Sequence, residues 1–280
     1  MSKGEDFEKC TCLAAWEQVQ GSGIALPQNV RTQMNTFSNR FRQNLDVRVS
    51  GRNAIPAMVA AGVNLSQVRH YGAAVKPSPK TDIIAGPFKI SCKWEDKGYQ
   101  LASGGISWTF SSLKNALAAA YETGDVPLGT FGEIDEVLND YAQTFGVGRR
   151  SKSSIDSLLT ANQTLQQQIS QHLGPVSSNA DASRVHSQFN KAVVYEALTG
   201  NEQWGETSTE SANYVLGNQS GFHKIDQNYV SIVAKYYSVR PYARKGRGSD
   251  PDPNIAQQEL VGRLEVTEGN TRRLLAELRH

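Results

Sequence analysis

Apolar residues recur every three or four positions in the first part of the chain, a spacing that predicts amphipathic helices. Residues 3–20 carry this pattern, and the Gly-Ser-Gly at 21–23 ends the predicted helix. The same spacing predicts a second helix in residues 27–41, and residues 53–68 have the composition of a third. The N-terminal part of the chain is therefore expected to be helical.

The pattern then changes to that of short strands. "DIIAG" at residues 82–86 and "FKISCKW" at residues 88–94 are rich in β-forming residues and bounded by Gly and Pro, which predicts a hairpin. Because side chains alternate along a strand, Ser91 and Lys93 are expected to share one face of the second strand. "YQLASGG" at residues 99–105 predicts a third strand.

The rest of the chain is predicted to be mainly helical, with Gly at several helix ends. A hairpin is expected around "GNQSG" at residues 217–221, and an exposed strand or arm in residues 238–246. The predicted helices span residues 109–123, 129–175 with a break near 145–154, 183–200, 226–237 and 254–278.

Together these elements predict an α/β protein with a small mixed central sheet flanked by helices, a helical middle and a C-terminal extension. The 280 residues are enough for one large domain or two modest ones. The expected segments are the first part of the core in residues 1–125, a helical insertion in 126–185, a helix-hairpin-helix segment completing or packing on the core in 186–248, and a linker with a C-terminal helix in 249–280.

Composition excludes several classes of protein. The chain is 39% hydrophobic and 20% charged with a net charge of +2, as in an ordinary globular protein. No apolar run reaches the roughly 18 to 20 residues of a membrane span, so no membrane partner is expected. The N-terminus is acidic and polar, unlike a signal peptide. We therefore expect an intracellular protein at synthesis.

Cysteine and histidine usage indicates no disulfide framework and no zinc site. The chain has an odd number of cysteines: Cys10, Cys12 and Cys92. The first two are too close in sequence for a normal structural disulfide. This usage favours a reducing compartment. No second Cys pair stands at a zinc-like spacing. The five His residues are scattered, without the spacing of a metal site or a catalytic triad.

The predicted hairpin carries the strongest candidate chemistry. Asp82 begins one strand, and Lys93 lies near the end of the next. Metal-dependent nucleases hold Mg²⁺ with carboxylates beside a phosphate, and a nearby Lys orients the attacking water or neutralises developing charge. An ordinary hairpin with a polar outer face would carry the same two residues, so the pair alone leaves both interpretations open.

Two further residues extend this pattern to a family resemblance. Glu8 stands in "GEDFE" on the first predicted helix, and Gln100 stands in "YQL" on the third strand. The order and spacing of four residues resemble the motif of the PD-(D/E)XK nuclease superfamily: Glu8, Asp82, Lys93 and Gln100. The resemblance covers roughly the first 110 to 125 residues. The resemblance implies a restriction-endonuclease-like fold and a Mg²⁺-dependent phosphodiesterase, in which Asp82 binds metal, Lys93 assists the water and the other two support the site.

One position departs from the family pattern. Ser91 stands two residues before the Lys, where the family has an acidic residue, and a Ser hydroxyl is not a strong metal ligand. A minority of restriction enzymes in the superfamily also have Ser-x-Lys and recruit a Glu from a later helix. Glu196, on a mostly apolar predicted helix, is the expected substitute and a second metal ligand, with Glu95, Asp96 and Glu122 as alternatives.

A basic segment near the C-terminus is a candidate nucleic-acid contact. Positive side chains on a flexible arm suit phosphate, and an interleaved aromatic side chain can stack on a base. A solvated loop is the alternative interpretation. The candidate contacts with DNA are Arg240, Tyr242, Arg244, Lys245 and Arg247.

Longer segments, such as "KTDII" with "ISCK" and "YEALTG" before a hairpin, resemble uncharacterised bacteriophage proteins, some of them virion-associated. This resemblance implies synthesis in the host cytoplasm, with packaging in the virion as the alternative location. We also expect a homo-oligomer. The leading prediction is a phage-type nuclease or nuclease-derived DNA-binding protein. The alternative is a structural head, neck or tail component with an inactive nuclease fold and other virion proteins as partners, and a weaker one is a counter-defence protein.

Overall fold

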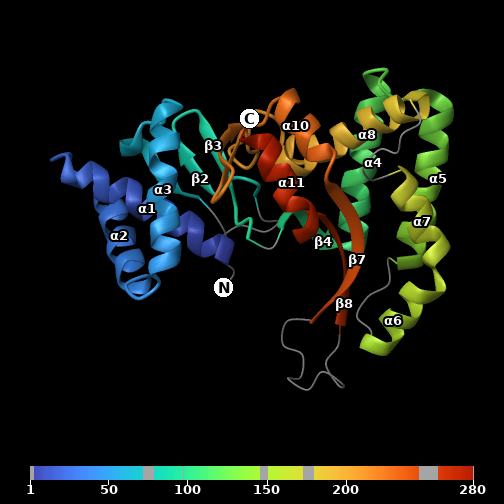
Figure 1. Cartoon of the computed structure of the whole chain (residues 1–280), viewed down its shortest axis with the longest axis horizontal. Helices are drawn as coiled ribbons and strands as arrows, with labels where there is room; N and C mark the ends of the chain where they lie inside the picture. Colours follow the sequence, from blue (N-terminus) through green and yellow to red (C-terminus); the bar gives the residue numbers. More distant parts are fainter. Residues whose placement is uncertain are drawn as a thin grey trace. The chain divides into compact units, whose positions relative to one another are not determined.

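The computed structural model describes residues 3–71, 79–96, 98–145, 151–172, 180–245 and 258–279, and Figure 1 shows its elements. The chain divides into two units. The first consists of Met1–Tyr99, Leu198–Tyr229 and Leu275–His280. The second consists of Gln100–Ala197 and Val230–Leu274.

A five-stranded mixed sheet forms the centre of the first unit, which confirms the predicted α/β class. The strand order is β1-β2-β3-β5-β6, and only the pairing of β3 with β5 is parallel. The strands are β1 Val68–His70, β2 Ile83–Ala85, β3 Phe88–Lys93, β5 Tyr214–Gly217 and β6 Gly221–Lys224.

Both predicted hairpins are present in this sheet. In the first, Ala85 pairs with Phe88, so β2 and β3 are joined by a two-residue turn. Gly86 has a φ of 62°, a left-handed conformation that Gly adopts without strain. In the second, Gly217 pairs with Gly221 at the turn between β5 and β6. The glycines in the sequence therefore mark the positions of both hairpin turns.

Helices α1 Lys3–Gly21, α2 Gln28–Arg40 and α3 Leu45–Ala60 pack beside the sheet (Figure 1). Helix α1 is buried around most of its circumference and contacts β1 and β3. Its Trp16 indole Nε1 donates to the carbonyl oxygen of Val68 at 3.0 Å, which joins the helix to β1. The largest buried side chains of this core include Trp16, Phe7, Leu13, Met58, Ile83 and Ile90.

The third helix differs from its prediction at both ends. It begins at Leu45, eight residues before the predicted start, and ends at Ala60. Gly62, with a φ of 87°, follows its end, and the Asn64 side chain accepts from the Ser66 backbone N–H at 3.0 Å to cap a 3-10 turn. The predicted last residue of that helix is instead the first of β1. The prediction was therefore wrong over residues 61–68.

Gly51 sets the distance between α1 and α3. A Cβ at this position would lie 2.6 Å from the carbonyl carbon of Cys10 and 2.8 Å from the backbone nitrogen of Thr11. We expect Gly51→Ala to force the two helices apart and to lower the free energy of unfolding by at least about 2 kcal/mol, measured by urea denaturation. Gly21→Ala is the matched control, because nothing lies within 4 Å of its Cβ. Equal stability of the two variants would contradict this packing.

The second unit contains a three-stranded sheet of order β4-β8-β7 and most of the helices of the chain. The strands are β4 Tyr99–Gly105, β7 Tyr237–Lys245 and β8 Gln258–Val266. The remaining helices of the chain are α4 Ile106–Glu122, α5 Leu128–Phe145, α6 Lys152–Ala161, α7 Gln163–His172, α8 Ala180–Thr199, α9 Asn201–Trp204, α10 Gln227–Ala234 and α11 Glu268–Leu278.

The prediction of one helix over residues 254–278 was wrong. Residues 258–266 form β8, and only residues 268–278 form α11. Strand β8 lies between β4 and β7, and Leu260, Val261 and Leu264 are buried. Consecutive residues such as Leu260 and Val261 are both buried, so both faces of β8 are covered and its sequence lacks a simple apolar-polar alternation. Gln, Glu, Leu and Arg are also good helix formers. These residues therefore suggested a helix where tertiary pairing makes a strand.

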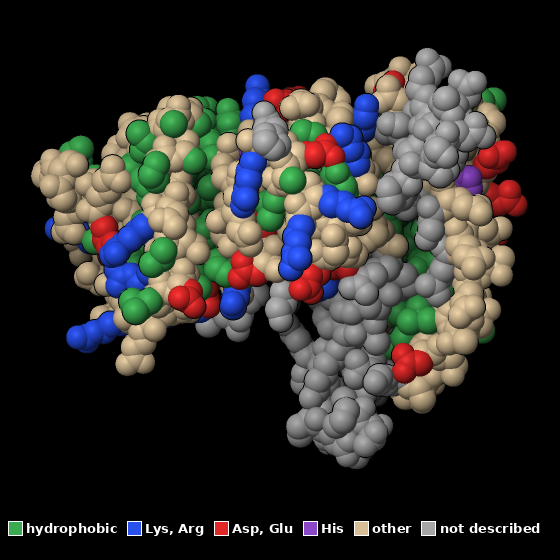
Figure 2. Space-filling view, in the orientation of Figure 1, with side chains coloured by type: hydrophobic (Ala, Val, Ile, Leu, Met, Phe, Trp, Pro, Cys, Tyr) green, Lys and Arg blue, Asp and Glu red, His purple; other side chains and the backbone are tan. Residues whose placement is uncertain are grey.

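In the described part of the chain, no helix is both long and apolar enough to cross a membrane. Figure 2 shows apolar side chains scattered among polar ones on the surface of the first unit. On α3, Leu45, Val49 and Val59 are exposed.

Candidate functional site

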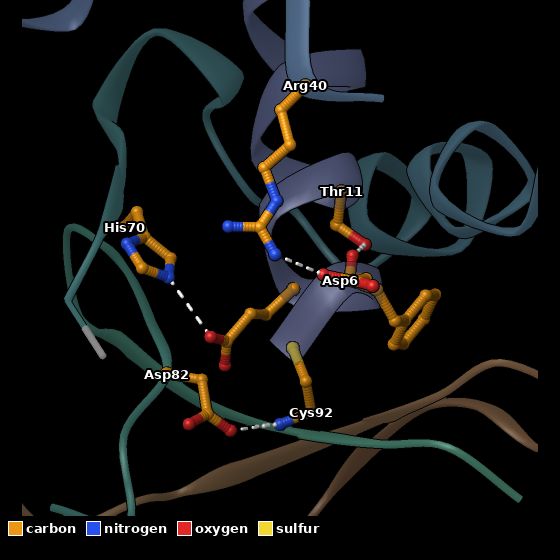
Figure 3. A network of polar contacts seen from close by, with 8 residues as sticks. Asp6, Thr11, Arg40, His70, Asp82 and Cys92 are labelled. Carbon is orange, nitrogen blue, oxygen red and sulfur yellow. Dashed lines mark hydrogen bonds and ion pairs between the residues drawn. The ribbon is translucent and has the colours of Figure 1, made fainter. Parts of the chain in front are cut away.

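Asp82 lies directly before β2, where the backbone already follows the sheet. Its N–H donates to the carbonyl oxygen of Ile90, and its own carbonyl accepts from the N–H of Tyr71, both at 2.8 Å. Its carboxylate turns toward β3, where Oδ2 accepts from the Cys92 backbone N–H at 2.7 Å (Figure 3). The sheet thus holds both the backbone and the carboxylate of Asp82 in place.

Glu8 of α1 brings a second carboxyl group to Asp82. Its side chain is buried, and the two carboxyl groups lie close enough to shift each other's pKa. Burial, followed by the neighbouring Glu8, raises the pKa of Asp82 to about 8. Burial also raises the pKa of Glu8 to about 7. Two carboxyls this close in a protected site cannot easily both ionise, so near neutral pH they share protons.

Lys93 brings a positive charge to this pair. It is the last residue of β3, and its ammonium group attracts the carboxyl of Asp82. Burial lowers the pKa of Lys93, and the charge of Asp82 opposes that shift. The structure therefore brings together three of the residues singled out in the sequence: Glu8, Asp82 and Lys93. They come from α1, from the position directly before β2 and from the end of β3.

The other predicted site residues are placed differently. Ser91 is buried within β3 and pairs with Val215 of β5. Gln100 on β4 and Glu196 on α8 both belong to the second unit, where the Gln side chain is exposed and the Glu side chain is buried. The roles predicted for Gln100 and Glu196 stay predictions.

Glu95, one of the alternative acids, is held by the turn between β5 and β6. Its carboxylate accepts from the backbone N–H groups of Gln219 and Ser220, each at 2.8 Å, and from the Ser220 hydroxyl at 2.6 Å. Only 1% of Glu95 is exposed. With three donors already on its oxygens, this carboxylate serves to fasten the end of β3 to the second hairpin.

Loss of the Glu95 carboxylate is expected to destabilise the fold. Glu95→Ala leaves buried donors of Ser220 without an acceptor, so we expect the free energy of unfolding to fall by about 3 kcal/mol in urea denaturation. Asp96→Ala is the matched control, since that side chain is 40% exposed. We expect the control to change stability by less than about 1 kcal/mol. Similar losses in both variants would contradict a specific role for Glu95.

His70 is a site residue that the sequence did not indicate. Its Nε2 lies 3.1 Å from Oε1 of Glu8, and its ring meets that of Phe37 edge to face, with centroids 5.5 Å apart. Burial is the main cause that lowers the pKa of His70 below 6.5, so the ring is neutral at pH 7. It stands 62 residues from Glu8, and no local motif marks it.

The predicted nucleic-acid segment lies on β7 and beyond it. Arg240, Tyr242, Arg244 and Lys245 belong to β7, whose backbone pairs with β8 along its whole length. Their side chains, like the whole of Arg247, lie outside the described residues. The prediction that this segment contacts DNA stays a prediction.

Among the described residues, no three His, Cys, Asp or Glu side chains are gathered in a ready-made metal cluster. The two oxygen donors of the site are the carboxyl groups of Glu8 and Asp82. Comparison of the chain with protein-family models, with curated proteins and with solved structures finds no match. The chemistry of the site must therefore be argued from its own residues.

Proposed function

We propose that the protein is a Mg²⁺-dependent nuclease whose site is formed by Glu8, Asp82 and Lys93. The observation that carries this proposal is the protected pair of neighbouring carboxyl groups, held by the Cys92 N–H and by His70, with a lysine beside it. In the absence of a cation, such a pair of carboxyl groups holds protons. A divalent cation that binds there displaces these protons. The raised pKa values are therefore those expected of an acidic site in its metal-free form.

The donor set suits Mg²⁺. This ion prefers oxygen ligands and is commonly held by one or two carboxylates while it keeps several waters, so a full protein cage is not needed. Bound Mg²⁺ would polarise a phosphate oxygen and lower the pKa of a bound water. Glu8 and Asp82 would hold the ion, and Lys93 would stabilise the negative charge that develops on the phosphate, or orient the attacking water.

The arrangement of these residues also supports a restriction-endonuclease-like core. Asp82 directly precedes β2, Lys93 ends the neighbouring antiparallel β3, and Glu8 lies on the first helix. This is the placement that the resemblance to the PD-(D/E)XK superfamily implies. The mixed sheet beside helices agrees with the same proposal.

Glu8 can also supply the acidic group that the family has at the position of Ser91. We propose that the acid missing from β3 is replaced by the carboxylate of Glu8, which neighbours Asp82. Glu95 is less suited to that role because its oxygens already accept three hydrogen bonds. Glu196 remains a prediction for a further ligand. The proposed substrate is DNA, with the basic segment on β7 as the proposed contact.

A cleavage assay tests the proposal. Purified protein should nick supercoiled plasmid DNA with Mg²⁺ or Mn²⁺. Lys93→Met should slow cleavage by about 100-fold, because the variant lacks the positive charge that stabilises the transition state. Lys89→Met is the matched control on the same strand. Its Nζ donates to the carbonyl oxygens of Glu206 and Ser208, so we expect wild-type activity.

Absence of cleavage by the wild-type protein, on DNA and RNA and with both metals, would overturn the enzymatic proposal. The alternative of a structural virion protein with an inactive nuclease fold would then be favoured. Co-purification of the chain with phage particles would support that alternative.

A further inference from the structure

His70 stands out among the buried polar groups of the first unit because it contacts the proposed site without belonging to its motif. Only 10% of its side chain and 6% of the Glu8 side chain are exposed. Figure 3 shows the ring at the end of β1, turned toward the carboxylate that lies near Asp82. The contact thus joins a third strand to the helix that carries Glu8.

The geometry assigns one Glu8 oxygen to this ring. Nε2 of His70 lies 3.1 Å from Oε1, so a ring protonated at Nε2 donates a hydrogen bond to that oxygen. Oε2 is left for a second partner. A Glu side chain has three rotatable bonds, and a bond to one oxygen together with burial restricts where the other oxygen points.

Packing in turn restricts the His70 ring. Phe37 of α2 meets it edge to face, with an interplanar angle of 88°. The backbone of His70 pairs with Ile83 of β2, next to Asp82. The ring is therefore anchored on the same strand pair that positions Asp82. It can fix the position of the Glu8 carboxylate relative to that of Asp82.

We infer that His70 is a positioning residue, which holds Glu8 by one oxygen so that the other faces the divalent cation shared with Asp82. This inference rests on the proposed function, because it assigns a role within the same site. His70 would orient a ligand of the ion without touching the ion itself.

Mn²⁺ affinity of the full-length protein, measured by isothermal titration calorimetry, tests this role without relying on cleavage. His70→Ala is expected to weaken binding roughly 10- to 100-fold, as loss of a hydrogen-bond partner behind a metal ligand typically does. His70→Gln should recover most of the affinity, because its amide nitrogen reaches the place of Nε2. His70→Asn should not, because its amide nitrogen reaches only the place of Nδ1.

The comparison of Gln with Asn keeps the test informative if His70→Ala fails to fold, because both amides preserve a polar side chain of similar size. Equal Mn²⁺ affinity of wild type, His70→Gln and His70→Asn would overturn the positioning role and leave the proposed site intact. Absence of Mn²⁺ binding by the wild type would instead overturn the proposed site, and the positioning role with it.

Discussion

Replacement of Asp82 by Asn is expected to abolish metal-dependent DNA cleavage while preserving the fold. The Asn amide oxygen can still accept the hydrogen bond from the Cys92 N–H that Asp82 accepts at 2.7 Å. The variant loses the negative charge that would hold the divalent ion, so we expect activity to fall by at least about 10²- to 10³-fold. The measurement is the initial rate of plasmid nicking in Mg²⁺ at pH 8.

Asp96→Asn is the control for this variant. Asp96 follows β3, its side chain is 40% exposed, and its carboxylate contacts Lys3 and Gln219. We expect it to cleave at the wild-type rate. If Asp82→Asn retained wild-type cleavage, or if the control lost as much activity, Asp82 would not be a metal ligand.

The metal-free protein is expected to lose stability as the pH rises from about 4 to about 8. Folding raises the pKa of Asp82 from 3.8 to about 8 and that of Glu8 from 4.5 to about 7. Between these limits the folded chain binds more protons than the unfolded chain, so the free energy of unfolding falls with rising pH. Glu95, whose pKa burial also raises, contributes with the same sign.

Urea denaturation in a chelator, at pH 5 and at pH 8.5, measures this loss. We expect the wild type to be less stable at pH 8.5 by a few kcal/mol, and Mn²⁺ to restore stability there because it binds the folded state. Asp82→Asn should lose much less stability between these two pH values, since the neutral amide does not repel Glu8. Equal pH dependence of the two proteins would contradict a coupled carboxyl pair.

The local chemistry of the site was accessible from the sequence because it depends on short-range pattern. Alternation along residues 88–93 and the Gly86 turn predicted the hairpin, so the proximity of Asp82 to the end of β3 followed from strand geometry. The helical position of Glu8 followed from apolar spacing. Its contact with Asp82 was anticipated only through the family resemblance, because periodicity does not predict how a helix docks on a sheet.

The remaining contacts join residues far apart in the chain, where no local pattern exists. His70 stands 62 residues after Glu8, and Ser220 stands 125 residues after Glu95. The parallel pairing of β3 with β5 likewise brings together strands separated by most of the second unit. Central strand β8 was mistaken for helix because its residues favour helices while its neighbours supply hydrogen-bonding partners on both sides.

The central claim is that Glu8 and Asp82 hold one divalent ion between them. The most direct test is the anomalous scattering of a crystal soaked in Mn²⁺ at pH 8. We predict one Mn²⁺ peak within about 2.0 to 2.3 Å of an oxygen of each carboxylate, distances typical of small divalent ions on oxygen ligands. A map with Mn²⁺ elsewhere, or with no ion between the two carboxyl groups, would contradict the claim.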